Sequence, residues 1–117
     1  MHELSIAQAV IDIAVAHARG RRVSGVEIHI GHLRQVVPAA LEFAFGLVAE
    51  GTPVEGARLE IEHVAAAGRC RRCGRETELD GWPLACGACG GLDVEVIRGE
   101  ELLVASLECE DEMAVSG

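Results

Sequence analysis

Four cysteines in two close pairs constrain the fold of this 117-residue chain more than any other feature of its sequence. Cys70-Arg-Arg-Cys73 and Cys86-Gly-Ala-Cys89 are separated by twelve residues, which gives a C-x2-C-x12-C-x2-C arrangement. A gap of two residues lets a turn direct both sulfurs of a pair at one ion, and two such turns supply four thiolates in the tetrahedron that zinc accepts. The sequence therefore predicts a zinc site made of Cys70, Cys73, Cys86 and Cys89.

This zinc ion is expected to be structural, because four protein ligands leave no position open for a substrate or a water molecule. The segment around the cysteines is rich in Gly and Arg and has little core of its own. Metal binding, worth ~10–16 kcal/mol in small zinc modules, would supply its folding energy. Four thiolates also hold iron in small redox proteins, but such centres need an apolar surrounding that this segment lacks. The fifth cysteine, Cys109, lies outside the quartet and is interpreted as a small buried or edge residue.

Outside the cysteine-rich segment, apolar residues recur with the periods of helices and strands. Ser5 and Gln8 have the spacing of a capping box, so Ser5 is the expected N-cap of the first helix, and Gly20 its expected stop. The pattern then predicts a strand at residues 26–30, a second helix at 38–50 that starts at Pro38, and another strand at 57–62. A last strand is predicted after the cysteine-rich segment, at residues 102–107.

These elements predict an α+β fold in which two helices pack on a small three-stranded sheet. The four-cysteine segment forms a zinc-ribbon-like subdomain that is inserted before the last strand. The expected division is an α/β domain of residues 1–67 plus 100–117 and a zinc-binding subdomain of residues 68–99.

The charge balance excludes some partners. Ten basic residues, all of them Arg, face 19 acidic residues, and the formal net charge of −9 repels phosphate backbones. Four arginines lie around the first cysteine pair: Arg69, Arg71, Arg72 and Arg75. They are explained by the −2 charge of a zinc tetrathiolate. They also leave open an alternative function, that of a zinc-ribbon module that binds nucleic acid or protein.

We expect a cytoplasmic protein that does not enter a membrane. No apolar stretch approaches the ~18–20 residues of a membrane span. The apolar segment Ile6–Ala16 has no basic residue before it and contains Asp12, so a signal peptide is not expected. The close cysteine pairs also differ from the dispersed disulfide framework of a secreted domain.

The first three residues, Met1-His2-Glu3, form a second candidate metal site. His2 is bulky, so removal of Met1 is not expected, and the α-amine of Met1 has a pKa of ~7.7–8.0 that permits deprotonation near neutral pH. The Met1 amine, the backbone nitrogen and imidazole of His2, and the amide nitrogen or carboxylate of Glu3 can then surround one divalent ion. Planar nitrogen coordination favours nickel(II) or copper(II) over zinc. With histidine in second place the fourth position exchanges easily, which suits delivery rather than storage.

No feature of the sequence indicates catalysis. The sequence has no nucleophile paired with a base, no phosphate-binding loop and no open catalytic metal, so we expect a carrier rather than an enzyme. Any nucleotide chemistry must then come from a partner. His17, His29 and His32 are assigned structural roles, and the role of His63, at the end of a strand beside the insert, stays open.

The start MHELSIAQAV, combined with the late cysteine quartet and the short return strand, resembles the HypA/HybF family of hydrogenase nickel incorporation proteins. The resemblance covers essentially the whole chain. It implies structural zinc at Cys70, Cys73, Cys86 and Cys89, and transported nickel at Met1, His2 and Glu3.

The resemblance also implies partners. The family works with a GTPase to load nickel into the large subunit of [NiFe]-hydrogenase, and some members serve urease, so urease maturation factors are further candidate partners. Neither nucleic acid nor a membrane is expected as a partner, and a homodimer stays open. The insert contains no histidine, so an additional nickel ligand from that region, where a family member has one, has no counterpart here.

Overall fold

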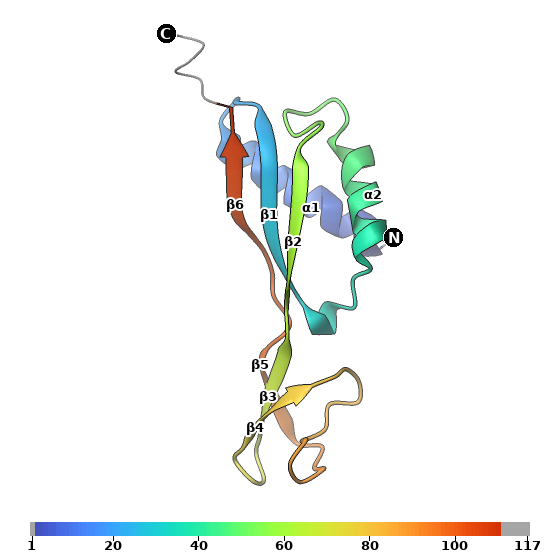
Figure 1. Ribbon diagram of the computed structural model, residues 1–117, viewed down its shortest axis with the longest axis vertical. Coiled ribbons are helices and arrows are strands. Elements are labelled where there is room, and N and C mark those ends of the chain that lie inside the picture. The colour runs from blue at the N-terminus through green and yellow to red at the C-terminus, as the bar shows by residue number, and fades with distance from the viewer. Residues whose placement is uncertain (1, 111–117) are drawn as a thin grey trace. The chain divides into compact units, whose positions relative to one another are not determined.

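The computed structural model describes residues 2–110 of the chain, with two α-helices, one short 3-10 turn and six strands (Figure 1). Their bounds, in chain order, are α1 His2–Ala18, β1 Val23–Gly31, η1 His32–Arg34, α2 Pro38–Ala49, β2 Arg58–Val64, β3 Ala66–Cys70, β4 Glu76–Leu79, β5 Val94–Arg98 and β6 Leu102–Cys109. Contacts divide the chain into two compact units, whose described parts are residues 2–28, 36–61 and 103–110 in the first and residues 29–35 and 62–102 in the second.

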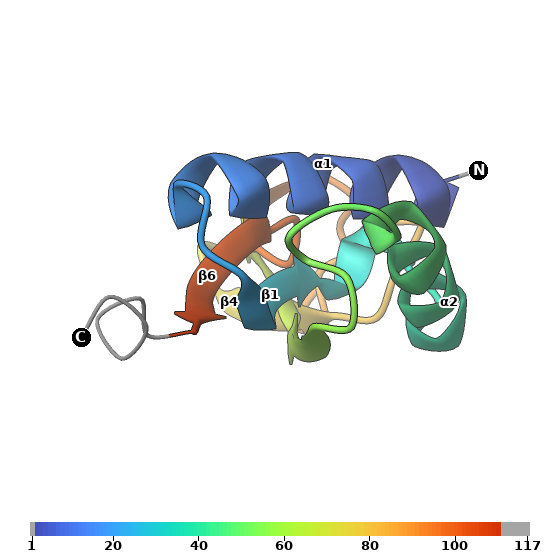
Figure 2. The same cartoon turned by 90° about the horizontal axis from the view of Figure 1, so that it is seen from above.

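The first unit confirms the predicted packing of two helices on a three-stranded sheet. The sheet has the order β2-β1-β6, and α1 lies across one of its faces (Figures 1 and 2). Helices α1 and α2 pack against each other. Their buried residues follow helical spacing: Ile6, Ala7, Val10, Ile11, Ala14 and Ala18 in α1, and Leu41, Ala44, Phe45 and Ala49 in α2. Neither helix has the length and apolar character needed to cross a bilayer, among the residues described.

Helix α1 begins earlier than the sequence predicts. It starts at His2, so Ser5 lies inside the helix with an exposed side chain, and the prediction of Ser5 as N-cap is wrong. The carboxylate of Glu3 accepts a hydrogen bond from the backbone N–H of Val37 at 3.1 Å, which holds the first helical turn in place. The helix ends at Ala18, and Arg19 and Gly20 follow with left-handed φ values of +55° and +85°, so the predicted stop at Gly20 lies two residues beyond the last helical residue.

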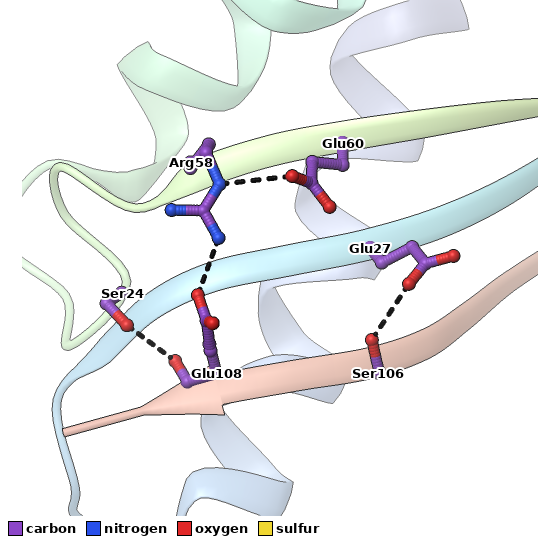
Figure 3. A network of polar contacts seen from close by, with 6 residues as sticks. All are labelled: Ser24, Glu27, Arg58, Glu60, Ser106 and Glu108. Carbon is purple, nitrogen blue, oxygen red and sulfur yellow. Dashed lines mark hydrogen bonds and ion pairs between the residues drawn. The ribbon is translucent and has the colours of Figure 1, made fainter. Parts of the chain in front are cut away.

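The sheet face away from the helices is polar (Figure 3). Arg58 of β2 bonds to Glu60 on its own strand and reaches over β1 to Glu108 on β6. Gly25 of β1 lies beneath this bridge, because a Cβ atom there would come within 2.9 Å of both Arg58 Nη2 and Glu108 Oε1. An ion pair thus joins the two edge strands across the central one, over a residue that has no side chain.

The second unit contains the cysteine-rich segment. Its sheet has the order β4-β3-β5 with antiparallel pairing throughout, and a β-bulge lies at Ala67 and Gly68. A small apolar cluster combines Leu33, Ala66 and Leu79, against which Leu84, Val94 and Val96 pack. Leu33 belongs to η1, so the connection after β1 contributes to the core of this unit.

Candidate metal centre

The two cysteine pairs occupy turns of the same construction. In the first, Cys70 N donates to Arg75 O at 2.9 Å and Gly74 N donates to Cys70 O at 2.8 Å. In the second, Cys86 N donates to Gly91 O and Gly90 N donates to Cys86 O, both at 2.8 Å. The glycine that follows each pair has φ +77°, a left-handed conformation that suits glycine. This repeated turn explains why each pair is followed directly by Gly.

The four sulfurs come together as the spacing predicts. All lie within 4.8 Å of one another, with Cys70 Sγ 3.6 Å from Cys89 Sγ and Cys73 Sγ 3.7 Å from Cys86 Sγ. Zn–S bonds of ~2.3 Å in a tetrahedron place the sulfurs about 3.8 Å apart. None of the five cysteines, all within the described residues, forms a disulfide. The quartet is therefore a group of thiols that fits one four-coordinate metal ion.

The environment of the sulfurs is asymmetric within each pair. Cys70 and Cys86 are buried, whereas Cys73 and Cys89 are exposed. N–H groups donate to each buried sulfur: Cys73 N to Cys70 Sγ at 3.5 Å, and Cys89 N and Ala88 N to Cys86 Sγ at 3.4 and 3.3 Å. Such donors stabilise a thiolate, so burial here does not prevent ionisation.

The hydrogen bonds shift the thiol pKa values in opposite directions. Backbone N–H groups of Cys89 and Ala88 lower the pKa of Cys86 to about 6, and those of Cys73 and Arg72 lower the pKa of Cys70. The N–H of Gly91 acts to lower the pKa of Cys89, but the neighbouring sulfurs of Cys70 and Cys86 outweigh it and raise that pKa to about 11. The pKa values of Cys70 and Cys86 are thus lowered by backbone donors, whereas that of Cys89 is raised by its sulfur neighbours.

Contacts outside the quartet support the turns. Thr77 Oγ1 of β4 accepts a hydrogen bond from Gly87 N at 3.1 Å, which ties the second cysteine turn to the sheet. The sequence gives no signal for this role of Thr77, because a threonine in a short strand has many uses.

Two of the four arginines near the first pair have acidic partners. Arg69 Nη2 lies 2.9 Å from Glu76 Oε2, and Arg71 Nη1 lies 2.8 Å from Asp93 Oδ1. These ion pairs reduce the positive charge that the cluster would offer to a phosphate backbone.

The N-terminal candidate site is described from His2 onward, and Met1 lies outside the described residues. His2 is exposed in the first turn of α1, and Glu3 follows it. The N–H of Val37 lowers the pKa of Glu3, so the carboxylate is ionised at neutral pH. The first backbone N–H groups of a helix have no acceptor within the helix, and the N–H of Glu3 contacts the carboxylate of the same residue, which also lowers the pKa of that carboxylate. Sequence reasoning missed the contribution of Val37, because a backbone N–H carries no sequence signal.

Three other histidines contact oxygen atoms of the chain. His17 Nδ1 lies 2.9 Å from Ile13 O, His29 Nε2 lies 3.4 Å from Glu62 Oε1, and His32 Nε2 lies 2.7 Å from Asp80 O. His63 is exposed at the end of β2, and Cys109 is half-buried at the end of β6.

Comparison with known proteins identifies the family. The sequence model described as "Hydrogenase/urease nickel incorporation, metallochaperone, hypA" matches residues 1–109. The chain belongs to the HypA family. It is 50% identical over 110 residues to the hydrogenase maturation factor HypA of Geotalea uraniireducens, covering 94% of this chain and 100% of that one. It is 40% identical over 111 residues to HypA of Nostoc punctiforme, covering 95% of this chain and 97% of that one.

A solved structure shows the same fold. The solution structure of the Ni metallochaperone HypA from Helicobacter pylori matches with a TM-score of 0.68 at 24% identity, over 93% of this chain and 97% of that one. The family is one of nickel incorporation in hydrogenase maturation, so this HypA-family chain is a metallochaperone and not an enzyme. The sequence-based assignment to the family is confirmed.

Proposed function

We propose that this chain binds one nickel(II) ion at Met1, His2 and Glu3 and delivers it to the large subunit of [NiFe]-hydrogenase with the help of a nickel-handling GTPase. The observation that carries the proposal is the position of His2 and Glu3 in the first turn of α1, in a chain that matches a nickel-incorporation family over residues 1–109. The turn offers a chelating backbone, and the exposed His2 offers an imidazole.

The helical start favours this chelate for a geometric reason. A five-membered ring through two successive backbone nitrogens needs both nitrogens on the same side of the residue between them. A helical ψ of about −42° is close to that arrangement, whereas an extended ψ of about +135° turns the nitrogens apart. The first turn of α1 is thus nearer to the nickel-binding conformation than an extended tail.

Transfer then proceeds by ligand exchange. Amine, amide and imidazole nitrogens suit planar nickel(II), and donors of the acceptor replace them one at a time. The chain itself supplies no nucleotide chemistry, so the GTPase provides any timing that depends on nucleotide hydrolysis. We place this exchange in the cytoplasm, where thiols such as those of the quartet stay reduced.

We further propose that Cys70, Cys73, Cys86 and Cys89 hold a structural zinc ion. Four thiolates at tetrahedral separations fill the coordination sphere, so the ion stabilises the fold and takes no part in nickel exchange. In this proposal, residues 1–67 and 100–117 form the nickel-binding domain, and residues 68–99 form the zinc-binding subdomain.

Substitution of His2 tests the proposed function. In zinc-loaded protein, His2→Ala should abolish stoichiometric nickel binding in a calorimetric titration while the zinc content stays at one ion per chain. His17→Ala is the matched control, because it removes an exposed histidine from the other end of the same helix. Equal nickel affinity of the His2→Ala and wild-type proteins would overturn the nickel site.

A further inference from the structure

The side chain of Glu3 contacts the start of α2. Its Oε2 accepts a hydrogen bond from the N–H of Val37, 34 residues further along the chain. Val37 is the N-cap of α2, has no side-chain cap of its own, and precedes Pro38, which has no N–H to donate. The carboxylate of Glu3 therefore caps the start of α2 from outside, at the positive end of that helix.

This contact changes the choice of ligand atoms at Glu3. The sequence leaves two donors open, the amide nitrogen and the carboxylate. A carboxylate that moved to nickel would leave the N–H of Val37 and the helix end without their anion. Binding through the amide nitrogen of Glu3 replaces only the contact between that N–H and the carboxylate of the same residue, and the contact with Val37 can persist.

We propose that Glu3 is a positioning residue: its carboxylate remains on the Val37 N–H when nickel binds and holds the first turn of α1 in the chelating conformation. The inference rests on the proposed nickel site and specifies how its third residue acts. Glu3 gives the metal its backbone nitrogen only, and its side chain ties that backbone to α2. Groups that orient metal ligands in this way typically contribute ten- to hundredfold to metal affinity.

Two substitutions at Glu3 separate positioning from ligation. Glu3→Ala removes the hydrogen bond and should weaken nickel binding about tenfold. Glu3→Gln keeps an oxygen that accepts from Val37 N and should stay within about twofold of wild type. If the carboxylate were a nickel ligand, Glu3→Gln would lose as much affinity as Glu3→Ala, and the proposal would be wrong.

A substitution on the donor side provides an independent test. Val37→Pro removes the N–H at a residue whose φ of −87° is close to the range of proline. It should weaken nickel binding as much as Glu3→Ala, and the double variant should be no weaker than either single variant. Additive losses would show that the two groups act separately. Glu42→Ala is the control, because it removes another exposed carboxylate from the first part of α2 and should leave the affinity unchanged.

The Val37 amide itself reports on the contact. In NMR spectra of the zinc-loaded protein, its hydrogen exchange should be slow in wild type and Glu3→Gln, fast in Glu3→Ala, and still slow after nickel is added to wild type. Fast exchange in nickel-loaded wild type would show that the carboxylate leaves Val37. Failure of the proposed function is distinguishable, because it appears as unchanged affinity in His2→Ala whatever the Glu3 variants do.

Discussion

Two glycines of β1 meet different neighbours, and the difference predicts how each tolerates a methyl group. A Cβ atom on Gly31 would lie 2.0 Å from the carbonyl carbon of Gly99, a backbone atom held by the hydrogen bond from Leu33 N to Gly99 O. A Cβ atom on Gly25 would meet only the ends of the Arg58 and Glu108 side chains. Backbone cannot move aside as a flexible side chain can.

Gly31→Ala should therefore lower the free energy of unfolding by about 3 kcal/mol or more. Gly25→Ala should change it by less than about 1 kcal/mol, because the ion pair above it can shift. Urea denaturation of the zinc-loaded proteins measures both values. Similar losses for the two variants would contradict the close approach of Gly31 and Gly99.

At the scale of single residues, periodicity alone does not select which side chains of the first helix are buried. Ile6, Val10, Ile11 and Ala14 are buried in α1, whereas Ile13 of the same helix is 43% exposed. A helix rich in apolar residues on several sides has no single face that spacing alone can select. The hydrogen bond between Glu3 and Val37 was also out of reach, because it joins distant residues through a backbone group.

At the scale of the elements, the two cysteine turns bring together four thiols with unequal pKa values. The pKa of Cys86, about 6, lies below the usual value of 9, so this thiol is ionised at pH 7.5 in the metal-free protein. Zinc binding at pH 7.5 should consequently release no more than three protons from the four cysteines. As the pH falls through 6, Cys86 takes up a proton that zinc must displace, so zinc affinity should decline more steeply below pH 6 than just above it.

Calorimetric titration with zinc in buffers of different ionisation enthalpy gives the number of protons released. Release of four protons at pH 7.5 would show that Cys86 is protonated in the metal-free protein. The same titration of the Cys86→Ser variant shows how much the Cys86 thiol contributes to the number of protons released.

The second unit should depend on its metal. Its apolar cluster is small, built on Leu33, Ala66 and Leu79, and both cysteine turns belong to this unit. Chelation of zinc should remove the protection of β3, β4 and β5 from hydrogen exchange, while α1 and α2 keep theirs. Mass spectrometry of peptides from the two units measures this, and protected β3 peptides after chelation would contradict a structural role of the metal.

The sequence predicted both helices and the strands β1, β2 and β6, because each has a clear period or a buried alternating pattern. It did not predict β3, whose residues Ala66, Ala67 and Gly68 are all buried. This central strand is covered on both faces and shows no alternation. Gly68 is fixed by packing, because a Cβ atom there would lie 2.4 Å from Val94 Cγ1. The cysteine spacing alone was enough to predict that the four sulfurs of this unit come together.

At the scale of the whole molecule, charge separates the metallochaperone from a nucleic-acid-binding zinc ribbon. The net charge is −9, and Arg69 and Arg71 are paired with Glu76 and Asp93. The zinc-loaded protein should show no binding to single- or double-stranded oligonucleotides at 150 mM salt in fluorescence anisotropy, because it offers few cations to replace counterions. Salt-sensitive binding in the micromolar range would favour the alternative.

In the proposed site, a free first amine and the adjacent imidazole together hold nickel, and a comparison of two proteins shows whether the amine is needed. Zinc-loaded protein with its native N-terminus and the same protein carrying an uncleavable N-terminal extension are titrated with nickel under identical conditions. The native protein should bind one nickel ion in planar nitrogen coordination, and the extended protein should not, although its His2 and all four cysteines are present. Equal binding by the two proteins would contradict the account.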